Sequence, residues 1–208
     1  MNDSLETERL ILRRFAASDL DQLVELDSDP EVMRFLTGGA ATPREVVERD
    51  ILPRFLQAHD RAPGYGFWAA VERGGGAFVG WFSLRPRPQV DLAEAVLGYR
   101  LRRAAWGRGY GTEGARALIR RGFAELGVRR ISATTYEDNL ASRRVMEKAG
   151  LTLVRSYRLT PTDLAAQDTY HAASQDLWDR DDVEYALEKA DWERQEAATF
   201  SEDVPAGQ

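Results

Sequence analysis

The segment from Trp106 to Gly114 contains the residues best suited to hold a ligand. It reads Trp-Gly-Arg-Gly-Tyr-Gly-Thr-Glu-Gly, follows a strand-like run at Glu94 to Leu101 and leads directly into an amphipathic helix. The glycines at 107, 109 and 111 allow a tight turn, so that successive amide hydrogens converge on an anion at the positive end of the helix. The segment therefore predicts a phosphate cradle and a phosphorylated cofactor.

Two other interpretations of these glycines exist. Gly109 to Gly114 also satisfies the G-x-G-x-x-G pattern of dinucleotide-binding folds, in which a second strand ends about 20 residues later in an acidic residue that binds ribose. Here that distance leads to Arg129 and Arg130. The dinucleotide interpretation is therefore disfavoured, while a surface turn without a ligand remains open at this point.

Length and composition favour one globular domain. The chain has 208 residues, of which 43% are hydrophobic, which suits a single core. We expect a domain over residues 1–195 and a flexible tail over residues 196–208. The absence of cysteine excludes disulfides, thiolate nucleophiles and cysteine-based zinc sites. With only His59 and His171 available as histidine ligands, no metal is expected.

The sequence favours a cytoplasmic protein without a membrane partner. No apolar stretch approaches the roughly 20 residues that span a bilayer. The first residues include Asp3, Glu6 and Glu8 and lack the pattern of a signal peptide.

Charge is distributed unevenly along the chain, whose net charge is −6. Arg100 to Arg130 contains nine arginines and two glutamates, which places the predicted anion site in a basic region. Thr160 to Gln208 contains thirteen acidic and three basic residues, and it either attracts a cationic substrate or keeps the chain solvated. Because the arginines alternate with an apolar helical pattern rather than forming a continuous stripe, no nucleic-acid partner is expected.

Periodicity and turn residues predict a mixed fold. The expected helices run from a cap at Ser18 toward Asp27, from Pro30, from a capping box at Thr42 to Glu45 with a kink at Pro53, from the glycine turn to Gly127, and from a cap at Asp138 or Asn139 to Gly150. The expected strands are Arg9 to Phe15, Gly66 to Glu72, Ala77 to Leu84, Glu94 to Leu101, Arg130 to Thr135, Leu151 to Leu159 and Val183 to Leu187. Gly74 to Gly76 forms a hairpin tip, and Thr160 to Asp182 is expected as a loop.

Five ordered segments resemble the RimJ/RimL-type branch of the GNAT acetyltransferases, over about three quarters of the chain. They are Leu-Glu-Thr-Glu-Arg-Leu-Ile-Leu-Arg-Arg from Leu5, Asp-Pro-Glu-Val-Met-Arg-Phe from Asp29, Leu-Gly-Tyr from Leu97, Trp-Gly-Arg-Gly-Tyr-Gly-Thr-Glu from Trp106, and Asn-Leu-Ala-Ser from Asn139 through Glu-Lys-Ala-Gly ending at Gly150. The resemblance implies an α+β fold with a GNAT-like central, mostly antiparallel twisted sheet, flanked by helices and splayed in the middle to admit acetyl-CoA.

The resemblance also implies a set of cofactor-binding residues. The glycine turn would hold the CoA pyrophosphate through backbone amides, the strand around Tyr99 would pair with the pantetheine arm, and Trp106 is expected to pack rather than contact phosphate. The cofactor-binding residues are expected to be Leu101, Gly107, Arg108, Gly109, Tyr110, Gly111, Thr112, Asn139 and Ser142.

In the family reaction an amine attacks the thioester directly, which requires a neutral amine and a protonated leaving thiolate. Many GNAT enzymes have a tyrosine donor where this chain has Met146, so Ser142 is the expected donor; a bond to a backbone carbonyl is its alternative role. Glu94 is the expected base, although Val96 replaces the glutamate often found before Leu-Gly-Tyr. Tyr99 is the third catalytic candidate.

Several alternatives stay open. Glu113, Glu137, Asp138 or a chain of waters could serve as the base, Tyr99 or His171 could orient the amine, and Trp68, Trp81 and Phe82 either line the acceptor slot or pack in the core. The acceptor is a protein N-terminus or a small amine such as an aminoglycoside or polyamine, bound near Asp27 to Gly39 and Thr160 to Asp182. A non-catalytic CoA-binding sensor is the second interpretation. A homodimer could form through an exposed strand at Val183 to Leu187.

Overall fold

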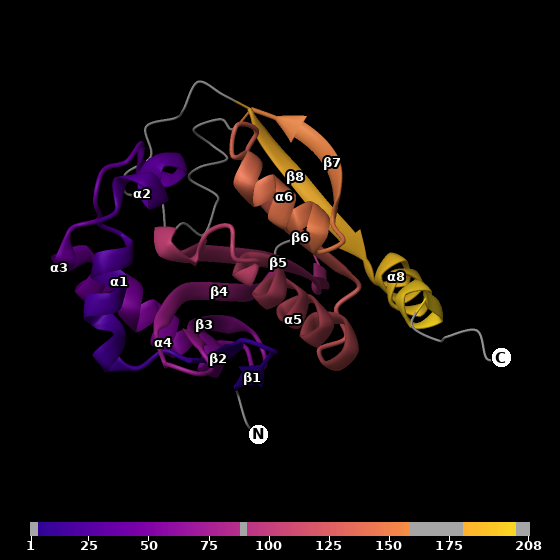
Figure 1. Ribbon diagram of the computed structural model, residues 1–208, viewed down its shortest axis with the longest axis horizontal. Coiled ribbons are helices and arrows are strands. Elements are labelled where there is room, and N and C mark those ends of the chain that lie inside the picture. The colour runs from indigo at the N-terminus through magenta and orange to yellow at the C-terminus, as the bar shows by residue number, and fades with distance from the viewer. Residues whose placement is uncertain (1–3, 88–90, 159–180, 203–208) are drawn as a thin grey trace.

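The computed structural model describes residues 4–87, 91–158 and 181–202. They form one mixed eight-stranded sheet in the order β1-β2-β3-β4-β5-β6-β8-β7, with helices on both faces (Figure 1). The neighbouring strands are antiparallel except for β5 and β6, which are parallel. The strands are β1 (Leu5–Glu6), β2 (Leu10–Arg14), β3 (Gly66–Glu72), β4 (Phe78–Arg87), β5 (Asp91–Leu101), β6 (Arg130–Tyr136), β7 (Thr152–Tyr157) and β8 (Asp182–Glu188).

The helices form two groups. Figure 1 shows α1 to α4 together on one side of the molecule and α5 and α6 on the other. The elements are η1 (Ala17–Asp19), α1 (Leu20–Leu26), α2 (Pro30–Thr37), α3 (Arg44–Val46), the π-helix η2 (Val47–Ile51), α4 (Leu52–Arg61), η3 (Arg103–Ala105), α5 (Tyr110–Glu125), α6 (Leu140–Lys148) and α8 (Lys189–Glu202). No helix of the described ranges is both long enough and apolar enough to cross a membrane.

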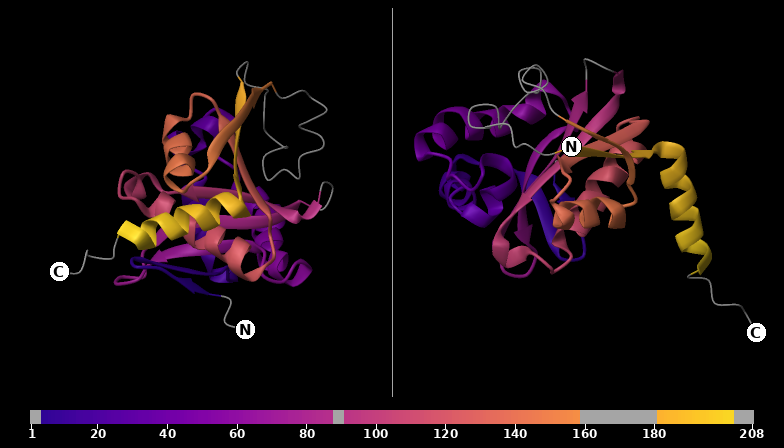
Figure 2. Two further views of the ribbon diagram at one scale, coloured as in Figure 1. Left: turned by 90° about the vertical axis from the view of Figure 1, so that its right-hand side faces the viewer. Right: turned by 90° about the horizontal axis from the view of Figure 1, so that it is seen from above.

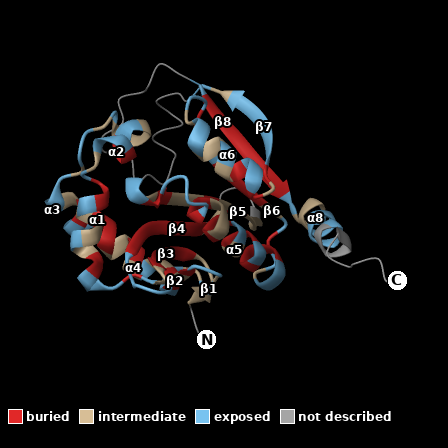
Figure 3. Ribbon diagram, viewed as in Figure 1, coloured by how far each residue is buried: buried red, intermediate tan, exposed pale blue. Residues whose placement is uncertain are grey.

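Each face of the sheet has its own hydrophobic core. On the side of α1 to α4, Phe55 of α4 stacks on Phe67 of β3 with ring centroids 3.9 Å apart, and Trp81 packs edge-on against both rings. On the side of α5 and α6, Trp68 and Phe82 are fully buried with residues such as Leu118. The three aromatic residues considered for the acceptor slot are therefore core residues, as Figure 3 indicates by the buried strands β3 and β4.

Strands β5 and β6 separate after a short paired stretch. Glu94, Ala95 and Val96 pair with Arg130, Ile131 and Ser132, and no later residues of these two strands pair with each other in the described part of the chain. Each strand instead keeps its other neighbour, since β5 pairs with β4 as far as Leu101 and β6 pairs with β8 as far as Tyr136. The sheet is thus splayed in its middle, as expected.

The helix starts differ from the predictions in two places. The Ser18 side chain does not cap the first helix: Asp19 accepts hydrogen bonds from the Ala16 amide at 2.8 Å and from Arg13, and the 3₁₀ turn η1 precedes α1. The predicted capping box at Thr42 is also wrong, because Pro43 is the cap of α3 and no side chain bonds the helix start. The π-helix η2 ends at Ile51, two residues before Pro53, which lacks an amide donor and lies in the first turn of α4.

The C-terminal elements correct the dimer hypothesis. Strand β8 lies between β6 and β7, so Val183 to Leu187 is not an exposed edge. The edge strand is β7, where Leu153 and Val154 are half exposed (Figure 3). Helix α8 extends away from the sheet and includes the first residues of the predicted tail (Figure 2). Its Trp192 ring lies 5.5 Å from the Phe123 ring of α5.

A buried ion pair joins helix α1 to the splayed strand β5. Arg100 of β5 bonds the Asp27 carboxylate at the end of α1, and the Arg100 and Asp27 side chains are 3% and 0% exposed. The guanidinium also lies over Trp81, 5.5 Å from the ring centroid. Because a charge left alone in such a place is poorly solvated, the pair fixes α1 relative to β5.

Asp27→Ala should therefore destabilise the protein by about 3 kcal/mol, since it leaves the buried Arg100 charge uncompensated. Urea unfolding followed by circular dichroism measures the change. Asp21→Ala is the matched control, because Asp21 pairs with Arg44 on the exposed surface and its loss should leave the midpoint nearly unchanged. Equal midpoints for the two variants would contradict a structural role for the buried pair.

Candidate functional site

The glycine turn after β5 exposes its backbone at the start of α5. Gly107 and Gly109 have φ angles of 71° and 83°, which favour glycine. A Cβ at Gly107 would meet nothing within 4 Å, so its backbone faces open space. The helical bonding of α5 begins with the Glu113 amide, which donates to the Gly109 carbonyl at 3.1 Å. The preceding amides at the helix start have no intrahelical acceptor and suit an anion.

Contacts from the segment between β1 and β2 hold this turn in place. The Arg9 guanidinium donates to the Arg108 carbonyl at 2.8 Å and pairs with Glu113 at 2.6 Å. Glu113 also accepts from the Thr7 hydroxyl and the Arg9 amide. Burial alone raises the pKa of Glu113, but these hydrogen bonds outweigh it and the pKa lies below its ordinary value. Glu113 therefore stays ionised and anchors the turn, which does not favour it as a base.

The side chains of Arg108 and Tyr110 bond to each other and to Glu72 at the end of β3. The Tyr110 hydroxyl donates to Glu72 at 2.7 Å and accepts from Arg108 at 2.9 Å, and Arg108 also pairs with Glu72 at 3.1 Å. Tyr110 is buried. These two residues thus connect the turn to β3, and their backbones are the parts available to a ligand.

Helix α6 and strand β5 pack closely against the start of α5, next to the glycine turn. A Cβ at Gly111 would lie 3.0 Å from Val145 of α6 and 3.6 Å from Leu101 of β5, so both elements approach the start of α5. The Leu101 carbonyl accepts from the Trp106 indole at 2.9 Å, although Trp106 remains 45% exposed. Leu101 is therefore in contact with the turn, and Thr112 lies in the first turn of α5.

The structure brings Tyr99 and Ser142 together. The Tyr99 hydroxyl lies 2.9 Å from Ser142 Oγ and donates to the Ser142 carbonyl at 3.0 Å. Burial raises the pKa of Tyr99 far above its ordinary value, and the hydrogen bond with Ser142 offsets this only in part. Tyr99 is therefore protonated at neutral pH. The two hydroxyls connect β5 with the first turn of α6 beside the opening between β5 and β6.

Asn139 caps the helix that carries Ser142. Its Oδ1 accepts from the Ser142 amide at 3.2 Å, and its Nδ2 donates to Thr135 Oγ1 of β6 at 3.0 Å. These contacts fix the start of α6 relative to β6, so the predicted cap is confirmed. Met146, which replaces the family tyrosine, is buried in the core.

The carboxylates considered as bases occupy different positions. Glu94 belongs to the paired end of β5 and lies 3.9 Å from Arg87, whereas Tyr99 lies five residues further, roughly 16 Å along an extended strand. Glu137 and Asp138 lie in the turn before α6, and the Glu137 carbonyl accepts from Arg143.

Of the acidic residues expected to attract a cation, Asp27 is already paired with Arg100 and Asp29 caps α2. His171 lies outside the described residues.

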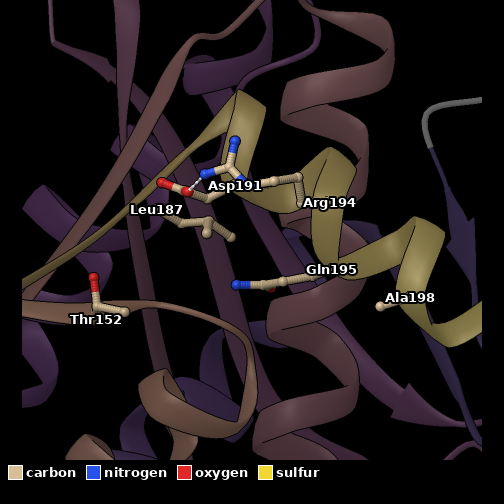
Figure 4. A pocket seen from close by; sticks show the side chains of 6 residues that line it. All are labelled: Thr152, Leu187, Asp191, Arg194, Gln195 and Ala198. Atoms are coloured by element: carbon tan, nitrogen blue, oxygen red, sulfur yellow. Dashed lines mark hydrogen bonds and ion pairs between the residues drawn. The ribbon is translucent and has the colours of Figure 1, made fainter.

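Two surface hollows occur elsewhere on the molecule. One, of about 480 Å³, lies between α8 and the sheet, and Figure 4 shows its lining residues, which are Thr152, Leu187, Asp191, Arg194, Gln195 and Ala198. The other, of about 750 Å³, lies between α1, α2 and the segment after β5, and is lined by Glu25, Leu26, Ser28, Asp29, Val32, Arg102, Arg103 and Ala104. Neither contains Tyr99 or Ser142. The separated parts of β5 and β6 beside Tyr99 and Ser142, rather than either hollow, are therefore the centre of the candidate site.

The turn and the gap fit an extended phosphorylated thioester. The turn offers exposed backbone, two residues without Cβ and the positive end of the sixteen-residue helix α5. The gap leaves the facing edges of β5 and β6 without a partner strand beyond Val96 and Ser132 in the described ranges. These features match an anionic group at the turn and a chain that bonds to the β5 backbone. Among the described residues no group of acidic and histidine side chains is arranged to hold a metal ion.

Sequence reasoning missed the residues that support the turn. Thr7, Arg9 and Glu72 are distant from the turn in sequence, and no local pattern connects them with it. The one available signal is the Thr-Glu-Arg motif at the N-terminus, which contains Thr7 and Arg9 and precedes β2.

Comparison with known proteins agrees with this geometry. The model of the acetyltransferase (GNAT) domain matches residues 9–152. FsC-acetyl coenzyme A-N(2)-transacetylase of Aspergillus fumigatus is 30% identical over 84% of this chain and 77% of that protein. The uncharacterized protein YkkB of Bacillus subtilis is 31% identical over 74% of this chain and 88% of that protein.

Solved structures share the fold. A GNAT acetyltransferase from Bacillus anthracis superposes with a TM-score of 0.71 at 23% identity, covering 90% of this chain and 99% of that one. RimL, a ribosomal L7/L12 α-N-protein acetyltransferase in complex with coenzyme A, gives a TM-score of 0.66 at 20% identity, covering 88% and 95%. The family match covers well over half of the chain and the fold agrees with it. The chain therefore belongs to the GNAT acetyltransferase family.

Proposed function

We propose that the acceptor of this acetyl-CoA-dependent N-acetyltransferase is a primary amine, either a protein N-terminus or a small amine such as an aminoglycoside or polyamine. The observation that carries the proposal is the Tyr99–Ser142 hydroxyl pair, which lies beside the gap between β5 and β6. The relative from Aspergillus fumigatus is named as a transacetylase that acts at a nitrogen, which agrees with N-acetylation. Assignment to the RimJ/RimL branch remains a prediction.

The residues that would hold acetyl-CoA follow from the geometry of the turn. Backbone amides from Gly107 to Thr112 would bind its pyrophosphate, and the β5 backbone up to Leu101 would bond its pantetheine arm. When bound, acetyl-CoA supplies the acetyl group as an activated thioester. An amide of β5 directed at the thioester oxygen would stabilise negative charge as the amine attacks.

Ser142 is the proposed proton donor to the leaving sulfur. Its hydroxyl is held by Tyr99, which stays protonated because burial raises its pKa. Tyr99 holds the Ser142 hydroxyl in place by its hydrogen bond, and Ser142 regains its proton from solvent, so the pair would supply the function of the tyrosine that Met146 replaces. Tyr99 acts in this scheme through Ser142 and is a positioning residue.

The test of the function is thiol release from acetyl-CoA by the purified protein, screened against N-terminal peptides, polyamines, amino acids and aminoglycosides. Turnover with one class of amine would identify the acceptor. Tight binding of CoA in calorimetry without turnover by any of these amines would instead favour the non-catalytic sensor, which Met146 and Val96 already suggest.

Ser142→Ala should lower kcat by about 100-fold while CoA affinity persists, because it removes a proton donor and no phosphate contact. Tyr99→Phe should have a smaller effect of the same kind, since Ser142 keeps its hydroxyl. Tyr65→Phe is the control, as Tyr65 packs against the same core away from the pair. Unchanged turnover by the Ser142 variant, measured by thiol release, would remove this residue from the mechanism.

Gly109→Asp should abolish CoA binding, measured by calorimetry. The substitution puts a side chain on a residue with a φ angle of 83°, and it adds a negative charge where the pyrophosphate would bind. Gly74→Asp is the matched control, because a Cβ at this hairpin tip meets nothing within 4 Å. Micromolar CoA binding by a folded Gly109 variant would exclude the turn as the phosphate site.

A further inference from the structure

Asp182 is a buried carboxylate at the open end of the sheet. It is the first residue of β8 and lies opposite Tyr136 of β6 and Tyr157 of β7. The residue is 7% exposed, and its Oδ2 atom has no hydrogen-bond donor in the part of the chain that the structure describes. A desolvated carboxylate oxygen without a donor is unfavourable, so a cationic or hydrogen-donating ligand would stabilise it.

Asp182 faces the side of the sheet opposite to the proton donor. Tyr185 of β8 donates to Glu147 of α6, so its side chain lies on the α6 face, where Ser142 also lies. Because side chains alternate along a strand, Asp182 and Glu184 lie on the other face. The amine adds to one face of the planar thioester and the sulfur leaves from another position around the same carbon, so different residues can serve the two atoms.

The other carboxylates of this face are already neutralised. Glu184 bonds Arg155 at 2.7 Å and lies 3.7 Å from Arg130 and 3.9 Å from Arg87. Glu94 lies 3.9 Å from the same Arg87, at the end where β5 and β6 are still paired. Asp182, by contrast, lies beside the end of β6 that has separated from β5.

The charged surroundings of Asp182 allow it to exchange a proton near neutral pH. Burial raises its pKa to about 7, and the neighbouring Asp181 carboxylate adds to the shift. The groups that face it are Tyr136 from β6 and Tyr157 from β7. Asp181 lies 3.8 Å from Arg158, and Glu184 and Arg155 form their own pair.

We propose that Asp182 binds the ammonium group of the acceptor and takes one of its protons. The proposal rests on the function inferred above. A protonated amine gives one proton to the Asp182 carboxylate and becomes a neutral nucleophile. Its lone pair forms the N–C bond, the tetrahedral intermediate loses the second nitrogen proton to solvent, and the C–S bond then breaks. The thiolate takes a proton from Ser142, which solvent reprotonates, and Asp182 releases its proton to solvent, so that ammonium and thioester give amide, thiol and one proton.

Asp182→Asn tests the proposal. Its kcat/KM for the amine should fall about 100-fold, and the rise of kcat/KM between pH 6 and 8 (roughly one unit either side of the expected midpoint) should disappear, while CoA affinity is unchanged. Asp181→Asn is the matched control, because it removes the adjacent exposed charge. It should keep the pH profile with the midpoint moved slightly to lower pH. An Asp182 variant that follows the wild-type profile would overturn the proposal.

A binding measurement separates this proposal from the function on which it rests. Calorimetric titration of the CoA complex with the amine found in the screen, or with spermidine if none is turned over, should show binding at pH 8 that Asp182→Asn weakens at least tenfold and Asp181→Asn does not. If amine binding depends on Asp182 but the wild type turns over no amine, the amine site is upheld and the proposed catalytic function is rejected. Turnover by the wild type with binding that is equal in all three proteins would reject the role of Asp182 alone.

Discussion

The separation of β5 from β6 is the constraint on which the site depends. Three residue pairs hold the strands together at Glu94 to Val96, and beyond them each strand follows a different neighbour. The backbone edge of β5 that is left without a partner strand can bond an extended ligand instead. The same divergence gives room for Tyr99 of β5 to meet Ser142 of α6. A continuous sheet could offer neither arrangement.

Contacts between distant segments keep the gap and the glycine turn in shape. Arg9 joins β2 to the turn through Glu113 and the Arg108 carbonyl, while Arg100 joins the open part of β5 to α1 through Asp27. On the other side of the gap, Asn139 joins α6 to β6. Polar contacts thus help the hydrophobic cores to fix β5 and β6 on the two sides of the gap. Strands fixed in this way suit a reaction that depends on the placement of two substrates and not on a covalent enzyme intermediate.

Much of the fold could be predicted because its signals are local. Runs rich in aromatic and β-branched residues mark β3 and β4, and Gly127 and Gly150 end their helices with φ angles of 71° and 97°. The glycine turn was predictable for the same reason. The support by Thr7, Arg9 and Glu72 depends on tertiary contacts, which no sequence pattern encodes. The same holds for the interior position of β8 and for the Asp19 side chain, which delays the start of α1.

The most direct test of the cofactor site is to measure hydrogen–deuterium exchange at individual backbone amides of the protein with and without CoA. If the gap and the turn form the cofactor site, CoA should slow exchange in two separate segments, the unpaired edge of β5 at residues 97–101 and the turn at residues 107–112. The edge strand β7 and the hairpin tip at Gly74 to Gly76 should not change. Protection confined to other segments, or no protection at saturating CoA, would contradict the account.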